Sequence, residues 1–584
     1  MNGVGTGSLA ASFRACQFAR TSFQTGSYRL PDTRRETTIM PRSVALCCVL
    51  TALLSVPLRA AELQPADQPI EQVVDHYVDA FIKADEVTTA PQANEATILR
   101  RLTLDLAGRI PTTKELRDYE ASTSETKRVE LVDRLLASPD FAFHHRNELE
   151  EILLPERRND GEFRKYLLWA AEQNRRWDDM YRDMLTGNEE DEYQKAALQF
   201  VRTRIRDVDD LTNATSVAFF GVNVSCAKCH DHPLVEDWKQ DHFYGLQSFL
   251  SRTYVTKKNV VLEKPFGEVK YTTREGVEKQ AKFMFLTGAD VEIASLELSG
   301  DDKKKLEEAI RKTQQDDNAP IPEQQGDSAR QKLVDVSLRE GDNRFFAQNI
   351  ANRIWQRMLG RGLVDPVDQI HSGNPASHPE LLEWLARDLV THGYDLKRLI
   401  RGIALSQTYS RTSEWTSAAE TPSPEYFALA TARPLTPRQY ALSLLVASRN
   451  PSHWDQEAFQ QTDRWRQERE NFENASNGWA GNFEAPTDGF QIAVDEALLF
   501  SNSDRIQNDL LRDSGDRLIG QIKAIEDDQT AITTAFLAIN SRQPTDEESA
   551  AIRDYLAARA DNRPEALRQA VWALLTGPEL RFNH

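Results

Sequence analysis

The stretch "SHPELLEWLARDLVTHGYDLKRLIRGIALS", Ser377–Ser406, gives the clearest indication of the fold class. It predicts a helix with Ser377 as its N-cap and Glu380 at the capping-box position three residues later. Gly393 fits the end of this helix, because glycine readily adopts the left-handed conformation of a C-terminal stop. Both end signals therefore predict a helix in this part of the chain.

Two stretches nearer the N-terminus repeat the helical period. In "DQPIEQVVDHYVDAFIKADE", residues 67–86, the apolar side chains fall on one face, as expected for an amphipathic helix. In "SETKRVELVDRLLASPDFAFHH", residues 124–145, Ser124 precedes the first turn and the inward positions are Leu131, Leu135 and Leu136. We therefore expect a mainly α protein.

The middle of the chain has a different composition. "NVVLEKPFGEVKYTT", residues 259–273, and "AKFMFLTG", residues 281–288, mix β-branched and aromatic residues with Gly and Pro, which predicts short strands. "TQQDDNAPIPEQQGDSARQK", residues 313–332, has no apolar period and predicts an exposed linker. The expected organisation is two helical units, 61–255 and 331–584, with a small β-containing insert and linker at 256–330.

The first 60 residues have the features of an export signal. "MPRSVALCCVLTALLSVPLRAAELQP" starts at Met40 and shows the charged, apolar and small-residue order of a secretory signal. We therefore expect Met40 to be the true start, with an upstream extension before it; a targeting role for that extension is the alternative. The protein would be exported, to the periplasm or the cell surface. No later apolar run is long enough to span a membrane, so no transmembrane anchor is expected after signal cleavage.

Charge and motifs narrow the classes of function. The 584-residue chain has a formal net charge of -19 at pH 7 and no basic stripe, which argues against a nucleic-acid partner. It contains neither G-x-S-x-G nor H-E-x-x-H, so the sequence does not favour a standard hydrolase or a zinc protease. The sequence does not decide whether the protein is an enzyme.

The chemistry concentrates in "GVNVSCAKCHDHP", Gly221–Pro233. Cys226 and Cys229 are the two cysteines that remain beyond the export segment, and His230 follows directly. Thiols one helical turn apart can add to the two vinyl groups of haem, and the adjacent imidazole can reach the iron. The spacing therefore predicts one covalent haem c, with His230 as the proximal iron ligand.

Two other interpretations of the motif stay open. Cys226, Cys229, His232 and His242 could form a Cys₂His₂ zinc site, although the second spacing is longer than in a usual zinc finger. The two cysteines could also form a plain disulfide, because an exported compartment favours oxidation. His230 directly after Cys229 favours haem, since a disulfide does not need it.

Two histidines are candidates for the sixth iron position. His242 shares a helical stripe with Trp238, Leu246 and Phe249, and His145 shares one with Phe141, Leu149 and Ile152. For each, a hydrogen-bonded core histidine is the other interpretation. Met284 is a third candidate, and the iron could also be five-coordinate.

Long motifs in the chain resemble a known pair of domains. "LRRLTLDLAGRIPTTKEL" and "CAKCHDHPLVEDWKQDHFYGLQSFLSR" resemble the planctomycete cytochrome-C-like domain of unknown function. "NRFFAQNIANRIWQRMLGRGLVDPVDQIHSG", with "VWALLTGPELRFNH" at the end, resembles the planctomycete-specific domain that follows it. The resemblance implies an exported protein with a cytochrome-c-like signature and supports Cys226, Cys229 and His230 as the candidate site. The chain departs from many relatives at "FAFHHRNELEEILLPE", residues 141–156, where they carry a Trp-rich segment.

The sequence thus predicts a c-type haem protein for periplasmic electron transfer or redox sensing, which acts on an unidentified redox or surface protein partner. The haem would supply the chemistry, and the protein would set ligation and docking. The alternative is a non-haem extracytoplasmic binding or scaffold module, in which the cysteines form a disulfide or zinc staple.

Overall fold

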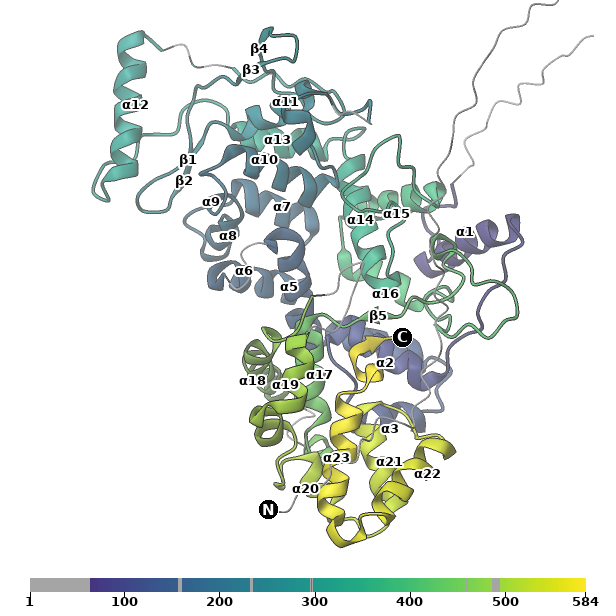
Figure 1. Ribbon diagram of the computed structural model, residues 1–584. Helices are drawn as coiled ribbons and strands as arrows, with labels where there is room; N and C mark the ends of the chain where they lie inside the picture. The colour runs from purple at the N-terminus through teal and green to yellow at the C-terminus, as the bar shows by residue number, and fades with distance from the viewer. Residues whose placement is uncertain are drawn as a thin grey trace, which may run out of the picture. The chain divides into compact units, whose positions relative to one another are not determined.

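A computed structural model describes residues 63–155, 160–231, 235–294, 296, 298–457, 461–485 and 494–584 (Figure 1). The expected export segment and His232 lie outside these residues. Within them the chain forms 24 α-helices and three two-stranded sheets, each antiparallel. The prediction of a mainly α protein with a few small β elements is confirmed.

Eleven helices come before the first strand. They are α1 (Ile70–Ala84), α2 (Glu95–Ala107), α3 (Thr113–Ala121), α4 (Lys127–Ala137), α5 (Pro139–Leu153), α6 (Gly161–Glu172), α7 (Trp177–Thr186), α8 (Glu192–Ala197), α9 (Gln199–Arg202), α10 (Val208–Thr215) and α11 (Gln240–Leu250). A π-helical turn, η2 (Ser216–Phe220), and a 3₁₀ turn, η3 (Ser225–Lys228), lie between α10 and α11. The predicted inward leucines of α4 are buried.

The middle region contains strands and one helix. β1 (Thr253–Val255) pairs with β2 (Val261–Glu263), and β3 (Lys270–Thr272) pairs with β4 (Glu278–Gln280). The expected strand at 281–288 is reduced to one isolated bridge between Met284 and Asp290. Helix α12 (Gly300–Gln315) was not expected, because it buries only Ile310 and Thr313 and so has almost no apolar face that a period could reveal.

Twelve helices follow the insert. They are α13 (Ala329–Leu338), α14 (Arg344–Leu359), α15 (Pro379–Thr391), α16 (Leu396–Leu405), α17 (Pro437–Ala447), α18 (Thr462–Ala480), α19 (Val494–Asn502), α20 (Leu518–Ile522), α21 (Asp528–Ile539), α22 (Asp546–Ala557), α23 (Arg563–Leu575) and α24 (Pro578–Arg581). The last sheet pairs β5 (Arg433–Pro434) with β6 (Phe582–Asn583). Short turns are η4 (Pro424–Tyr426), η5 (Pro451–Asp455), η7 (Ile506–Leu510) and η8 (Ala560–Asn562).

The start of α15 differs from its prediction. The helix begins at Pro379 with His378 as N-cap, and no side chain caps it. Ser377 instead places its hydroxyl 3.0 Å from Nδ1 of His378. Proline at the first helical position has no amide to satisfy, so a capping box is less needed here. Gly393 does follow the helix end in the left-handed conformation, with φ of +64°.

The apolar core consists of two clusters. The first takes residues from Ile70 to Ala428, so helices α13–α16 share it with the N-terminal helices. The second takes residues from Leu435 to Leu580, together with Leu104 and Ile110 of the N-terminal part. Figure 1 shows the helices after β5 grouped together. The insert therefore does not separate two independent cores.

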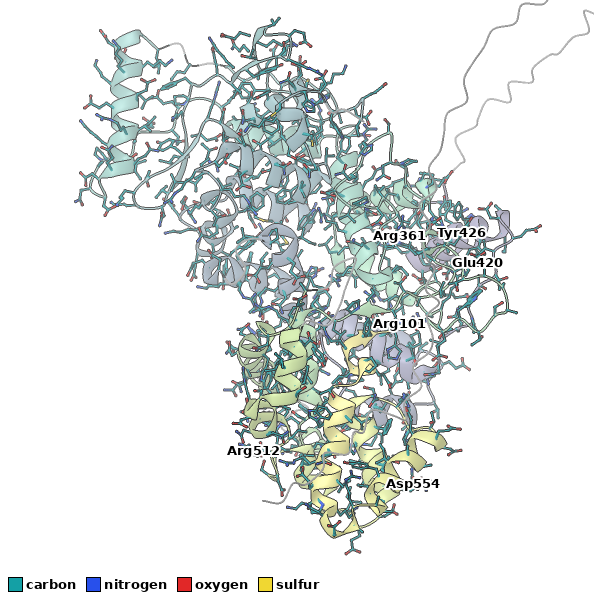
Figure 2. All side chains as sticks on the ribbon, viewed as in Figure 1. Arg101, Arg361, Glu420, Tyr426, Arg512 and Asp554 are labelled. Atoms are coloured by element: carbon teal, nitrogen blue, oxygen red, sulfur yellow. The ribbon has the colours of Figure 1, made fainter. Side chains whose placement is uncertain are left out.

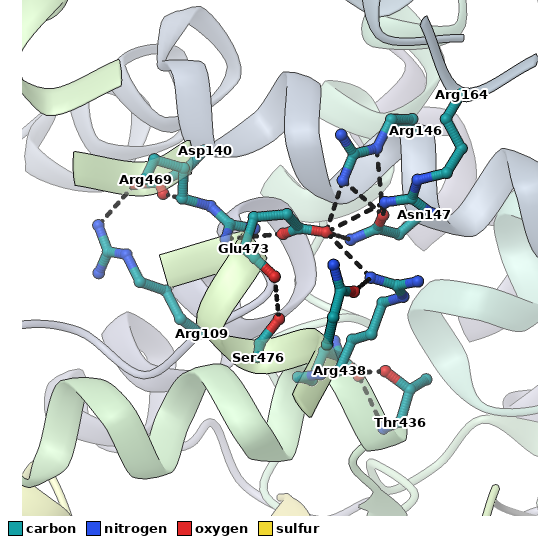
Figure 3. Close-up of polar contacts among 12 residues, drawn as sticks. Arg109, Asp140, Arg146, Asn147, Arg164, Thr436, Arg438, Arg469, Glu473 and Ser476 are labelled. Atoms are coloured by element: carbon teal, nitrogen blue, oxygen red, sulfur yellow. Dashed lines mark hydrogen bonds and ion pairs between the residues drawn. The ribbon is translucent and has the colours of Figure 1, made fainter. Parts of the chain in front are cut away.

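Buried polar groups tie distant parts of the chain together. Arg101 of α2, labelled in Figure 2, donates to the carbonyls of Tyr409 and Arg411 at 2.6 and 2.8 Å. A larger network joins α5 to α18 (Figure 3), in which Glu473 accepts from Asn147 at 3.0 Å. The members of this network are Arg109, Asp140, Arg146, Asn147, Arg164, Arg438, Arg469 and Glu473. These charged side chains can be buried because each is paired with an opposite charge or a hydrogen-bond partner.

Candidate functional site

The C-x-x-C-H motif follows a sharp change of direction at Gly221. This residue ends η2 with φ of +67°, a conformation that favours glycine. A Cβ here would come within 2.6 Å of Cδ1 of Ile370 and 2.8 Å of Oδ1 of Asn349. Glycine is therefore required both by its backbone conformation and by the close approach of α14 and the segment after it.

The segment before the motif is supported by residues 368–370. Val222 forms an antiparallel bridge with Gln369, the amide of Asn223 donates to the carbonyl of Asp368 at 2.9 Å, and the amide of Ile370 donates to the carbonyl of Gly221 at 3.0 Å. Asn223 in turn accepts from the amide and hydroxyl of Ser225 at 3.2 and 2.6 Å, which starts the short helix η3. A later part of the chain thus fixes the entry to the motif.

The two cysteines lie at the surface. Both are exposed free thiols, whereas Ala227 between them is fully buried and anchors η3 to the apolar core. One turn of 3₁₀ helix separates the two positions. The thiols are therefore accessible to a reagent or a prosthetic group from solvent.

His230 is oriented by one short hydrogen bond. Its Nδ1 lies 2.7 Å from the carbonyl oxygen of Asp231. A carbonyl only accepts, so this contact assigns the proton to Nδ1 and leaves the lone pair on Nε2. A hydrogen bond from the other ring nitrogen to a carbonyl is the usual support of a metal-binding histidine.

Helix α11 supports the second half of the motif. The carbonyl of Lys228 accepts from the hydroxyl of Tyr244 at 3.0 Å and from Nε2 of Gln240 at 3.3 Å. The backbone amide of Gln240 donates to the Asp231 carboxylate at 2.9 Å. The sequence prediction missed these partners, although the i, i+4 spacing of Gln240 and Tyr244 places both on one helix face.

His242 lies beside the motif, at the start of α11. Its Nδ1 accepts the backbone amide of Lys239 at 3.2 Å, and its ring meets Trp238 edge-on at 5.6 Å. Burial lowers the pKa of His242, which favours its neutral form. In this arrangement Nδ1 accepts a hydrogen bond and Nε2 carries the proton. Neither nitrogen then offers a lone pair to iron while the contact with Lys239 is kept.

His145 lies in a different environment. It is buried on α5, stacks on Phe141 at 5.2 Å, and has Nη1 of Arg357 3.3 Å from its Nδ1. Burial, with the Arg357 charge beside it, lowers the pKa of His145 to about 3. Helix α5 packs on α2, α6 and α18, whereas η3 packs on α11, and Figure 1 shows α5 and α11 well separated. The inward orientation predicted for His145 is confirmed, but the structure does not bring it to the motif.

The zinc interpretation depends on His232, which lies outside the described residues. Among the residues that the structure describes, no group of three or more His, Cys, Asp or Glu side chains is arranged to hold a metal ion. Met284, the third candidate ligand, packs against Gly245 of α11, whose Cβ would come within 2.9 Å of it.

The residues present fit a covalently bound haem. Attachment needs two accessible thiols one turn apart and an imidazole nitrogen that can bind iron. Cys226 and Cys229 are exposed, and the contact from His230 to Asp231 leaves Nε2 as the nitrogen with a lone pair.

Comparison with known proteins identifies two regions of the chain. The family model described as "PSCyt2: Protein of unknown function (DUF1549)" matches residues 73–254, and the model described as "PSD1: Protein of unknown function (DUF1553)" matches residues 329–480. No curated protein and no solved structure matches the chain. In the described part of the chain, no helix combines the length and apolar character needed to cross a membrane. The resemblance found in the sequence is confirmed for these residues, including the order of the two regions, whereas the C-terminal stretch "VWALLTGPELRFNH" lies outside the matched residues.

Proposed function

Because residues 73–254 belong to the PSCyt2 family and residues 329–480 to the PSD1 family, we propose that this chain is an exported c-type haem protein. One haem would be held by thioether bonds to Cys226 and Cys229, with Nε2 of His230 as the proximal ligand. Its role would be electron transfer or redox sensing in the periplasm or at the cell surface, with a redox or surface protein as partner.

The hydrogen bond from Nδ1 of His230 to Asp231 is the observation that carries this proposal. It fixes the tautomer that a proximal ligand requires, in the residue that directly follows the second thiol. A disulfide staple would not require an oriented imidazole at this position. When bound, haem supplies an iron that exchanges one electron.

The residues of the chain would set how that iron works. Because Cys226 and Cys229 are exposed, they would hold the haem where a partner protein can approach it. His230 would hold the iron on one side, and the polarity around the motif would tune its potential. The exposed surroundings include the charged residues Asp231 and Lys228, so ionic strength would affect docking of a charged partner.

The proposal is tested by staining a denaturing gel for haem and recording a pyridine haemochrome spectrum. The protein is produced in a host that matures haem c, because thioether attachment needs that machinery. We expect stain at the position of the full chain and none in the Cys226→Ser, Cys229→Ser double variant. A Glu470→Ala variant, which changes an exposed side chain of α18 and leaves the motif and its supporting contacts intact, serves as the control and should stain.

The alternative is a non-haem scaffold or binding module with a cysteine staple. Elemental analysis and thiol alkylation of the same preparation separate the outcomes. Stoichiometric zinc without haem would favour the metal staple. Thiols that react only after reduction would favour the disulfide, and either result would overturn the haem proposal.

A further inference from the structure

The carbonyl of Lys228 receives two hydrogen bonds from one face of α11. Tyr244 donates its hydroxyl at 3.0 Å, and Gln240 donates its side-chain amide at 3.3 Å. The two donors are one helical turn apart, so a rigid element presents both of them. This carbonyl belongs to the residue directly before Cys229, and its position therefore fixes where the Cys229 backbone begins.

A second anchor lies directly after His230. The Gln240 backbone amide donates to the Asp231 carboxylate at 2.9 Å, and the Asp231 carbonyl accepts from His230. The Asp231 carboxylate thus lies against the N-terminus of α11, whose first residue is Gln240. The amides at a helix N-terminus and the helix dipole favour a negative charge there. Cys229 and His230 are thus held between two anchors that share Gln240.

These polar contacts add to the ion pair between Lys228 and Asp209, which also holds this half of the motif. A single 3₁₀ turn has poor internal hydrogen-bond geometry, and its buried side chain is Ala227, before both anchors. Tyr244 is itself fixed, since its ring stacks on Tyr271 at 4.2 Å with an interplanar angle of 11°. The hydroxyl of Tyr271 bonds Asp241, which ties the β3–β4 hairpin to α11.

We infer that Gln240 and Tyr244 are positioning residues that hold Cys229 and His230 in the geometry required for haem attachment and iron ligation. The inference rests on the proposed function for its haem readout. The two donors restrict the backbone between Lys228 and Asp231, and so limit the positions open to the second thiol and the imidazole. They would touch neither the haem nor the iron, and they act through the motif backbone.

The test compares Tyr244→Phe, alone and combined with Gln240→Met, with wild-type full-length protein. Phenylalanine keeps the ring stack on Tyr271 and removes only the hydroxyl. Tyr426→Phe is the matched control, because it removes a phenol hydrogen bond of 2.7 Å to Asp85, far from the motif in sequence (Tyr426 is labelled in Figure 2). Two readouts are measured: amide hydrogen exchange in a peptide covering 226–231 without haem, and haem occupancy with reduction potential after maturation.

In Tyr244→Phe, exchange at residues 229–231 should become about two- to ten-fold faster, the effect of losing one net hydrogen bond. Haem occupancy should fall and the potential of the loaded fraction should shift, with larger effects in the double variant. Tyr426→Phe should match wild type in both readouts. Unchanged exchange and unchanged occupancy in the double variant would overturn the inference while leaving the haem proposal intact. If wild type carries no haem, the proposed function fails, and the exchange readout alone then decides whether the two residues fix the motif.

Discussion

One hydrogen bond sets the tautomer of the His230 imidazole. The contact to the Asp231 carbonyl fixes the proton on Nδ1, and the neighbouring His242 has the opposite assignment because its Nδ1 accepts an amide. His230 and His242 are therefore in different tautomeric states. One presents a lone pair on Nε2, whereas the other closes the start of a helix.

His230→Ala is expected to separate attachment from ligation. Both thiols remain, so haem should still be attached at reduced yield, but the absorption spectrum should show loss of the proximal ligand. His392→Ala, at the end of α15, is the control and should leave the spectrum unchanged. A wild-type spectrum in His230→Ala would mean that another residue binds the iron on that side.

The candidate site could be predicted from three residues, because the C-x-x-C-H spacing places two thiols about one helical turn apart with an imidazole directly after the second. The spacing could not predict the tautomers of His230 and His242, which follow from backbone contacts at Asp231 and Lys239. Nor could it predict the support of Gly221 and Asn223 by residues 368–370, because no period links segments so far apart.

At the scale of elements, α5 and α18 are joined by paired charges rather than by apolar packing alone (Figure 3). Glu473 is almost completely buried and receives hydrogen bonds from Arg146, Asn147, Arg164 and Arg438 on one oxygen, and from Arg469 on the other. Removing one member of such a network leaves the opposite charges buried without a partner, which costs more than the pair contributes.

Glu473→Ala is therefore expected to destabilise the fold by about 3–5 kcal/mol, the usual cost of breaking a buried ion pair. Glu470→Ala, an exposed neighbour on the same helix, should change the free energy of unfolding by less than about 0.5 kcal/mol. Chemical denaturation of the two variants measures both values. Equal effects in the two variants would show that the network does not stabilise the fold.

The lowered pKa of Glu473 allows a prediction of how the stability of the fold depends on pH. Burial alone would raise the pKa of Glu473, but Arg469 and Arg146 outweigh it and lower the pKa from 4.5 to about 2. A carboxyl with a lowered folded-state pKa stabilises the fold above its unfolded pKa and loses that contribution as the pH falls. Wild type should therefore lose stability between about pH 4.5 and pH 2, and Glu473→Ala should lose less over that range.

Elements with a strong apolar stripe, such as α1 and α4, could be predicted from the sequence. Helix α12 could not, because most of its residues are exposed and more than half are charged, which leaves almost no apolar face. The strand expected at 281–288 has suitable residues, but that segment packs its backbone against Gly245 and forms one bridge instead of a ladder. Tertiary contact here outweighs local preference.

At the scale of the molecule, the shared first cluster makes the helices before and after the insert dependent on each other. A fragment of residues 63–330 would lack α13–α16 and expose the apolar surface they cover, so it should aggregate. A fragment of residues 63–430 keeps every buried residue of that cluster and should be the more soluble of the two. Size-exclusion chromatography and thermal melts compare them, and cooperative unfolding of the shorter fragment would contradict a shared core.

The proposed function requires that Cys226, Cys229 and His230 together hold one covalent haem. Intact mass spectrometry of the protein purified from a host that matures haem c tests it most directly. The predicted result is the mass of the processed chain plus one haem, with the added mass on the peptide that contains Cys226–His230. The mass of the unmodified chain from the same host, with two thiols that can be alkylated, would contradict it.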